Sequence, residues 1–144
     1  MGKKTIKVIF DANVYVSFYL TRSETFRAIF DLWKNDAFTV YISEDIIAEI
    51  YRVFRYPRIL QRTTDTDRWA LTELLEEHTS RVHVVKHVQF PPDLDDAKYL
   101  SAASTCGADY LVTGDKKHLL LLKTFGMTRI VSPKEFVQVL GKGI

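Results

Sequence analysis

The sequence predicts an α/β fold with a central parallel sheet of about five strands flanked by helices. Short runs rich in β-branched and aromatic residues alternate with helical patterns, an order that is typical of βαβ units. The 144 residues suit one domain, and 47% hydrophobic and 26% charged residues are ordinary for a globular protein. We therefore expect a single domain over residues 1–144, without repeats or an interdomain linker.

The expected elements follow from hydrophobic periodicity. The clearest strands are residues 6–10, 38–42 and 109–113, and weaker candidates are 82–88 and 129–131. Helical patterns lie near residues 23–35, 44–55, 65–80, 96–106 and 133–140. Ser43 can cap the second of these helices, and the segment Ser132-Pro133-Lys134-Glu135 has the pattern of a capping box before the last.

Composition excludes several classes of protein. Cys106 is the single cysteine, so an internal disulfide and a multi-cysteine zinc site are excluded. No run reaches the roughly 18 apolar residues of a membrane span, and the first residues lack the apolar stretch of a signal peptide. We expect a cytoplasmic protein without a membrane partner.

A basic segment interleaved with aromatic residues begins in the second half of the helix predicted at 44–55. Residues 51–61 contain no acidic side chain, and their basic and aromatic members are Tyr51, Arg52, Arg55, Tyr56 and Arg58, with Arg62 next. On one helix, this spacing would place the arginines on one side. Such a face could follow a phosphate backbone and stack on bases, although a solvated helix face explains the same pattern.

Two aspartates follow predicted strands directly. Asp11 comes after residues 6–10, and Asp115 ends the segment Thr113-Gly114-Asp115 after another apolar strand. In parallel α/β sheets the functional groups gather at the carboxyl ends of strands. We therefore expect both carboxylates at the same edge of the sheet.

Glu49 and a group of aspartates extend this acidic set. Glu49 falls along the apolar stripe of its predicted helix, where a carboxylate is costly to bury unless a metal or a salt bridge compensates it. Asp93, Asp95 and Asp96 precede the helix at 96–106, where aspartates are also common caps. Three acids in four residues exceed what a cap requires, so we expect a metal ligand among them.

Four converging carboxylates repel one another. Two charges about 5 Å apart at an effective dielectric near 20 cost about 3 kcal/mol per pair, so such a cluster requires protons or cations. Oxygen ligands without histidine or cysteine favour Mg²⁺ or Mn²⁺ over zinc. A site of this kind suits phosphodiester hydrolysis.

Four segments, taken in their order along the chain, resemble the motifs of one family. They are VIFDANV at 8–14, the AEI and YPRI parts of 43–59, DLDDAKYL at 93–100 and ADYLVTGD at 108–115. This pattern resembles the PIN domain, especially its toxin branch, which is related to the VapC-like ribonucleases. The similarity runs from about residue 6 to residue 137. Leu94 stands where the family often has proline.

The resemblance implies a three-layer PIN fold and an endonuclease that cuts RNA with Mg²⁺ or Mn²⁺. It implies that the catalytic and metal-binding acids are Asp11, Glu49, Asp96 and Asp115, with Asp93 as a possible accessory ligand. It also implies that Asn13 and Thr113 orient ligands or water. Expected partners are RNA, a cognate antitoxin and a second copy of the chain, with RNA contacts from Arg52, Arg55, Arg58 and Lys116.

Single residues argue against two other functions, and two alternatives remain open. A dehalogenase-type phosphatase would need a second aspartate where Asn13 stands. His83 and His87 lie four apart in a segment that alternates like a strand, and the other two histidines offer no matching pair, so we expect no zinc site. The remaining alternatives are a PIN-fold protein that binds RNA or an antitoxin with little catalysis, and a nuclease that acts on other single-stranded nucleic acid in RNA processing.

Overall fold

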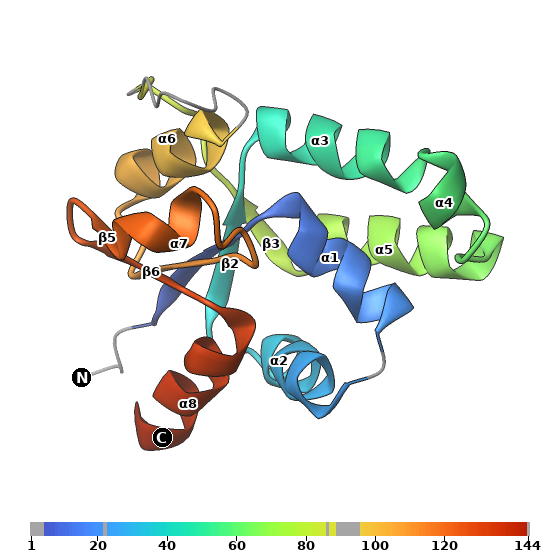
Figure 1. Ribbon diagram of the computed structural model, residues 1–144, viewed down its shortest axis with the longest axis horizontal. Coiled ribbons are helices and arrows are strands. Elements are labelled where there is room, and N and C mark those ends of the chain that lie inside the picture. Colours follow the sequence, from blue (N-terminus) through green and yellow to red (C-terminus); the bar gives the residue numbers. More distant parts are fainter. Residues whose placement is uncertain (1–4, 22, 86, 89–95, 144) are drawn as a thin grey trace.

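A computed structural model describes residues 5–21, 23–85, 87–88 and 96–143, and places a six-stranded sheet at the centre of the molecule (Figure 1). The strands in spatial order are β3 (Thr79–Arg81), β2 (Thr39–Ile42), β1 (Lys7–Phe10), β4 (Tyr110–Val112), β6 (Thr128–Val131) and β5 (Thr124–Phe125). All neighbouring pairs are parallel except β5 and β6. The predicted α/β fold with a central parallel sheet is confirmed, with an antiparallel edge strand in addition.

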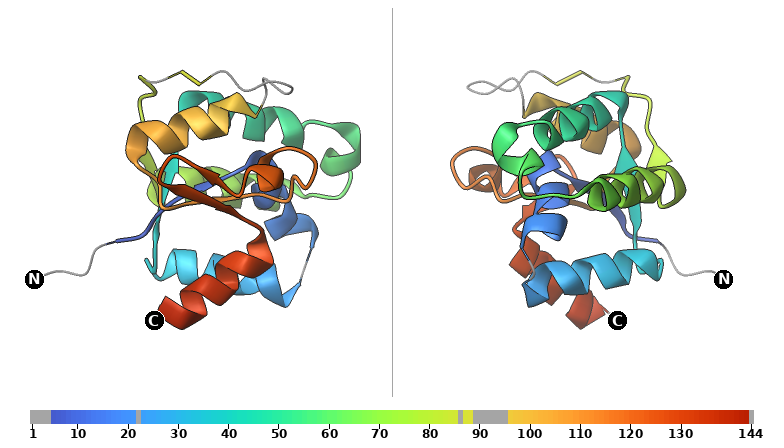
Figure 2. Two further views of the ribbon diagram at one scale, coloured as in Figure 1. Left: turned by 60° about the vertical axis from the view of Figure 1, so that its left-hand side comes forward. Right: turned by 90° about the vertical axis from the view of Figure 1, so that its right-hand side faces the viewer.

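Helices cover both faces of this sheet. They are α1 (Ala12–Leu20), α2 (Glu24–Lys34), α3 (Glu44–Phe54), α4 (Pro57–Leu60), α5 (Asp65–Glu77), α6 (Ala97–Cys106), α7 (Leu119–Leu122) and α8 (Pro133–Gly143). Figure 2 shows three layers, with α3 and α6 on one side of the sheet and α2 and α8 on the other. None of the helices in the described part of the chain is long and apolar enough to cross a membrane.

Phe10, the last residue of β1, is the centre of an aromatic cluster. Its fully buried ring meets five others edge to face, with centroids 5.6–6.2 Å away: Tyr15, Phe18, Trp33, Phe38 and Phe136. Edge-to-face pairs add to the stabilisation that burial itself provides. Because these rings come from α1, α2, α8 and the residue before β2, the cluster holds the end of β1 in place.

Helix α1 was not predicted. Its sequence, ANVYVSFYL, is rich in β-branched and aromatic residues, which favour strands when they are considered alone. Four residues of α1 are buried, and its contacts with α3 and α2 account for an apolar surface on more than one side. The helix forms because tertiary packing outweighs local propensity, and because Asp11 caps its first turn.

The strand predicted at 82–88 was wrong in position. Strand β3 is Thr79–Arg81, and pairing with β2 ends where the Val82 amide donates to the Ile42 carbonyl. The chain then runs along α6, where the Val85 and Val88 amides donate to hydroxyls on that helix, at 3.4 and 2.9 Å. Hydroxyl groups of α6 thus accept hydrogen bonds from backbone amides that would otherwise donate to a neighbouring strand.

The prediction of one basic helix face was also wrong. Helix α3 ends at Phe54, with Arg55 as its C-cap, and Pro57 begins the separate helix α4. Proline disfavours helical conformation in the preceding residue, so the helix breaks there. Arg52, Arg55 and Arg58 are all exposed, but they lie on three different pieces of backbone.

Two predicted helix starts are confirmed. The Ser43 hydroxyl accepts from the Ile46 amide at 3.2 Å, and so caps α3. Ser132 and Glu135 form the reciprocal bonds of a capping box before α8, each 3.1 Å long. These signals depend on residues within one turn, which is why they can be read from sequence.

Candidate active site

The register of β1 and β4 brings the first acidic residues together. Phe10 lies beside Val112 in this parallel pair, so the next residues, Asp11 and Thr113, are neighbours at the carboxyl edge of the sheet. The Thr113 hydroxyl donates to Asp11 Oδ2 and accepts from the Asp115 amide, the latter at 3.0 Å. Thr113 therefore connects the two aspartates at this edge of the sheet.

Asp11 is a buried carboxyl with several donors. Its Oδ1 accepts from the Asn13 amide at 2.7 Å and from the Val14 amide at 3.2 Å, and the side chain caps α1. Burial raises the pKa of Asp11 above its ordinary value, although the hydrogen bonds from Thr113 and the two amides act in the opposite direction. The folded protein thus resists ionisation of Asp11 unless a positive charge is close.

Asp115 is held in the turn that follows β4. Its Oδ1 accepts from the Lys117 and His118 amides, each at 3.2 Å, and its Oδ2 accepts from the Leu119 amide at 3.4 Å. Partial burial opposes ionisation, but a hydrogen bond with the Asp96 side chain and the three amide donors outweigh it and lower the pKa of Asp115. Asp115 therefore offers an ionised carboxylate in a constrained position.

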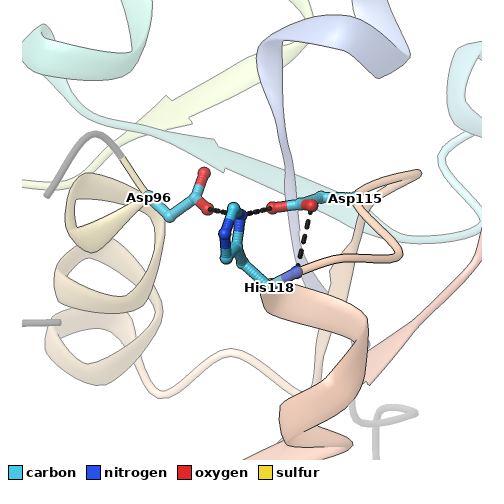
Figure 3. A group of neighbouring side chains, drawn as sticks. All are labelled: Asp96, Asp115 and His118. Carbon is cyan, nitrogen blue, oxygen red and sulfur yellow. Dashed lines mark hydrogen bonds and ion pairs between the residues drawn. The ribbon is translucent and has the colours of Figure 1, made fainter. Parts of the chain in front are cut away.

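Asp96 and His118 complete a compact group with Asp115 (Figure 3). Asp96 occupies the N-cap position of α6, yet its side chain makes no capping hydrogen bond and points towards Asp115. His118 Nδ1 lies 3.9 Å from Asp96 Oδ2 and 3.6 Å from Asp115 Oδ2. One ligand atom from each of the three residues lies within 4.8 Å of the others.

His118 was not among the residues predicted for this site, because the sequence offers no second histidine at the spacing of paired metal ligands. The relevant signal is its place three residues after Asp115, in a turn whose amides the Asp115 carboxylate accepts from. Within the described residues, Asp96, Asp115 and His118 are the group of three side chains with the geometry to hold a metal ion.

Glu49 faces the same region but is paired with cations. Its Oε2 lies 2.9 Å from Lys98 Nζ, and Arg52 of the same helix also donates to it. The Glu49 and Lys98 side chains are only 15% and 14% exposed. The salt bridge that the sequence left open as an alternative is thus present in this structure.

The acids and their neighbours line one cavity of about 660 Å³. Its lining includes Asp11, Asn13, Glu49, Tyr56, Arg58, Asp96, Lys98, Tyr99 and Asp115. The structure thus brings all four predicted acids and Asn13 to one cavity. Arg55 and Lys116 are exposed and do not line it, while Asp93 and Asp95 lie outside the described residues.

The donor set fits a divalent ion. Two carboxylates and an imidazole within a few ångströms are common ligands for such ions. A cation there would also act favourably on the buried Asp11, which senses the charge of Asp115. The residues present therefore suit a metal centre chemically.

A comparison with family models identifies the protein class. The model of the PIN domain matches residues 7–117, which is most of the chain. The chain belongs to the PIN-domain family. PIN domains are nucleases, so the match assigns this chain to a family of phosphodiester hydrolases.

Solved structures show the same fold at low sequence identity. PAE2754 from Pyrobaculum aerophilum is 18% identical and superposes with a TM-score of 0.65, covering 95% of this chain and 90% of that one. VapBC2 from Rickettsia felis, bound to a DNA fragment from its promoter, is 15% identical with a TM-score of 0.60, covering 88% and 98%.

VapC20 from Mycobacterium tuberculosis, a toxin that cleaves the sarcin-ricin loop, is 14% identical with a TM-score of 0.53, covering 85% of this chain and 98% of that one. No curated protein matches the sequence of this PIN domain. Because the sequence identities are low, the likeness to these structures shows a common fold alone.

Asp11→Asn is expected to stabilise this PIN domain in the absence of divalent ions. Because the pKa of Asp11 is raised, its stabilising contribution is complete below the ordinary value of 3.8 and is lost as the pH rises through the raised value. Asparagine resembles the neutral acid at every pH. The variant should therefore melt above the wild type at pH 7 in EDTA, and the difference should shrink towards pH 4.

Thermal denaturation between pH 4 and pH 7 measures this difference. Asp31→Asn is the control, since Asp31 is exposed on α2 and its substitution should change the melting temperature little. A melting temperature for Asp11→Asn below that of the wild type at every pH would contradict the prediction.

Glu49→Gln is expected to destabilise the metal-free protein. The substitution leaves the Lys98 ammonium largely buried without its carboxylate, which should cost about 3 kcal/mol of unfolding free energy. Adding Lys98→Met should recover more than half of that loss, because the uncompensated charge is then removed. Urea denaturation of the two single variants and the double variant measures the coupling.

The exposed pair of Arg81 and Glu44, 3.5 Å apart, provides the comparison. Glu44→Gln should cost less than about 1 kcal/mol, since solvent screens that pair. Equal losses for Glu49→Gln and Glu44→Gln would show that burial adds nothing to the interaction between Glu49 and Lys98.

Proposed function

We propose that this PIN domain is a metal-dependent endoribonuclease that hydrolyses RNA phosphodiester bonds, with Mg²⁺ or Mn²⁺ held by carboxylates. The observation that carries the proposal is the convergence of Asp11, Glu49, Asp96 and Asp115 on one cavity at the carboxyl edge of the sheet. A family of nucleases and a donor set suited to divalent ions support the same conclusion.

The proposed residues have different tasks. Asp96 and Asp115 supply ligand oxygens directly, and Asp11 adds a buried carboxylate whose negative charge a cation would compensate. Thr113 orients Asp11, and Asn13 lies at the cavity where it can orient water or substrate. A bound divalent ion would activate water and stabilise the charge on the leaving oxygen. Asp93 stays a predicted accessory ligand.

Basic and aromatic groups beside the acids suit a nucleic-acid substrate. Arg58 and Lys98 line the cavity and can meet phosphate charges. Tyr56, which also lines it, is 48% exposed and offers a ring on which an unpaired base can stack. These features favour a single-stranded segment of RNA, whose bases are accessible.

We further propose that the protein is a toxin in a toxin–antitoxin pair, acts in the cytoplasm and pairs with a second copy of itself. The fold that it shares with VapBC2 and VapC20 supports this proposal. A contact between two copies needs exposed apolar side chains: Trp69 on α5 is 65% exposed, whereas Phe18 and Tyr19 are packed against the core. Trp69 is therefore the better candidate for a contact.

A second candidate function is binding of RNA or an antitoxin with little cleavage. The pairing of Glu49 with Lys98 and Arg52 favours it, because those cations neutralise one of the four acids. A nuclease that acts on other single-stranded nucleic acid would use the same cavity. Cleavage assays with RNA and single-stranded DNA distinguish these functions.

Asp96→Asn is expected to abolish RNA cleavage while the protein remains folded. Losses of residues that only support metal ligands cost about 10- to 100-fold, so loss of a ligand oxygen should lower cleavage with Mn²⁺ by at least about a hundredfold. Gel analysis of a labelled RNA after incubation with each protein measures the rate, and circular dichroism checks the fold.

Asp31→Asn, purified in the same way, controls for contaminating ribonuclease. Cleavage by the wild type should stop in EDTA and return with excess Mn²⁺. Equal cleavage by Asp96→Asn and the wild type would reject the proposed catalytic site, and folded wild type that binds RNA without cutting it would favour the binding function.

Arg58→Glu is expected to weaken RNA binding more than Arg55→Glu. Both arginines are exposed, but only Arg58 of the two lines the cavity. In the Asp96→Asn background, fluorescence anisotropy at several salt concentrations should show a salt dependence reduced by about 0.7 in log–log slope for each lost phosphate contact. Equal effects of the two substitutions would indicate a diffuse basic surface instead.

A further inference from the structure

His118 places an imidazole beside Asp96 and Asp115. It lies between β4 and α7, in the turn that Asp115 organises by accepting the His118 amide at 3.2 Å. That bond places the imidazole on the same side as the carboxylates, and Figure 3 shows its ring between Asp96 and Asp115. The side chain is 33% exposed, so an ion can reach it from the solvent.

The separations suit ligands of a single ion. Two ligand atoms at about 2.1 Å from one ion lie about 3 Å apart when adjacent and about 4.2 Å apart when opposite. His118 Nδ1 lies 3.6 Å from Asp115 Oδ2 and 3.9 Å from Asp96 Oδ2, which is within that range. The described side chains therefore need only small rotations to share an ion.

We propose that His118 Nδ1 is a direct metal ligand with Asp96 and Asp115, so that the site selects a first-row transition ion such as Mn²⁺ over Mg²⁺. The inference rests on the proposed function, since it concerns the same metal site. Mg²⁺ takes oxygen ligands and retains water, whereas imidazole nitrogen is a better ligand for transition ions. One nitrogen among the carboxylates thus changes the preference expected for an all-oxygen site.

The proximity has a second explanation in the metal-free protein. A protonated His118 would form an ion pair with the two acids, and the same distances would result. In that case the imidazole would leave the acids when an ion binds, and the preference for Mn²⁺ would not depend on it. The two explanations differ in whether nitrogen is bound to the ion.

Pulsed electron paramagnetic resonance tests this difference directly on the wild type. The purified full chain is freed of metal with EDTA, dialysed and loaded with less than one equivalent of Mn²⁺. Electron spin echo envelope modulation should show coupling to a directly bound ¹⁴N nucleus. Absence of that coupling in Mn²⁺-loaded wild type would overturn the inference without need of any variant.

His118→Asn gives the matched measurement, because its amide oxygen stands near the position of Nδ1. Calorimetric titrations with MnCl₂ and MgCl₂ should show at least about a tenfold loss of Mn²⁺ affinity and less than about a threefold change for Mg²⁺. The ¹⁴N coupling should disappear. His83→Asn, at an exposed position, should change neither affinity. An unchanged ratio of Mn²⁺ to Mg²⁺ affinity in His118→Asn would also overturn the inference.

Asp115→Asn separates this inference from the proposed function. If it loses both ions while His118→Asn keeps the wild-type ratio, the carboxylate site stands and the role of His118 is rejected. If Asp115→Asn binds Mn²⁺ as tightly as the wild type does, the metal site of the proposed function fails as well.

Discussion

The parallel pairing of β1 with β4 is the constraint on which the site depends. It sets Phe10 beside Val112 and therefore Asp11 beside Thr113, whose hydroxyl connects Asp11 to the backbone of Asp115. The aromatic cluster around Phe10 holds one strand in this register. A slip of one residue would turn Asp11 to the other face of the sheet, and the acids would no longer meet.

The fold compensates three of the four acids of the cavity in different ways. Asp11 is buried, so its pKa is raised, whereas a hydrogen bond with the Asp96 side chain and hydrogen bonds from the turn amides lower the pKa of Asp115 despite its partial burial. Glu49 is neutralised by Lys98 and Arg52. One carboxyl thus resists ionisation, one is held ionised and one is paired with cations. This division reduces the repulsion that four equal carboxylates would suffer, and it leaves Asp96 and Asp115 as the oxygen donors beside His118.

The local signals in the sequence were sufficient for most of the sheet and several helix starts. Strands such as β1 and β2 are short β-branched runs, and the Ser43 cap and the capping box at Ser132 involve residues within one turn. Helix α1 could not be predicted, because its residues favour strands until the core surrounds them. The alternating segment at 82–88 was wrongly predicted as a strand, because its Val85 and Val88 amides donate to hydroxyls on α6 and not to a neighbouring strand.

The sequence by itself determined that Asp11 and Asp115 follow strands that end at the same edge of a parallel sheet, since strand ends are local properties of the chain. The resemblance to PIN domains added Glu49 and Asp96 to this pair. Only the tertiary structure decided what surrounds each acid. Lys98 meets Glu49 across 49 positions, and Thr113 meets Asp11 across 102. His118 lies with Asp96 and Asp115, although the sequence has no second histidine at a spacing that would indicate a metal ligand. Such contacts depend on which elements pack together, and the free energy of that packing belongs to the whole core and not to any one segment.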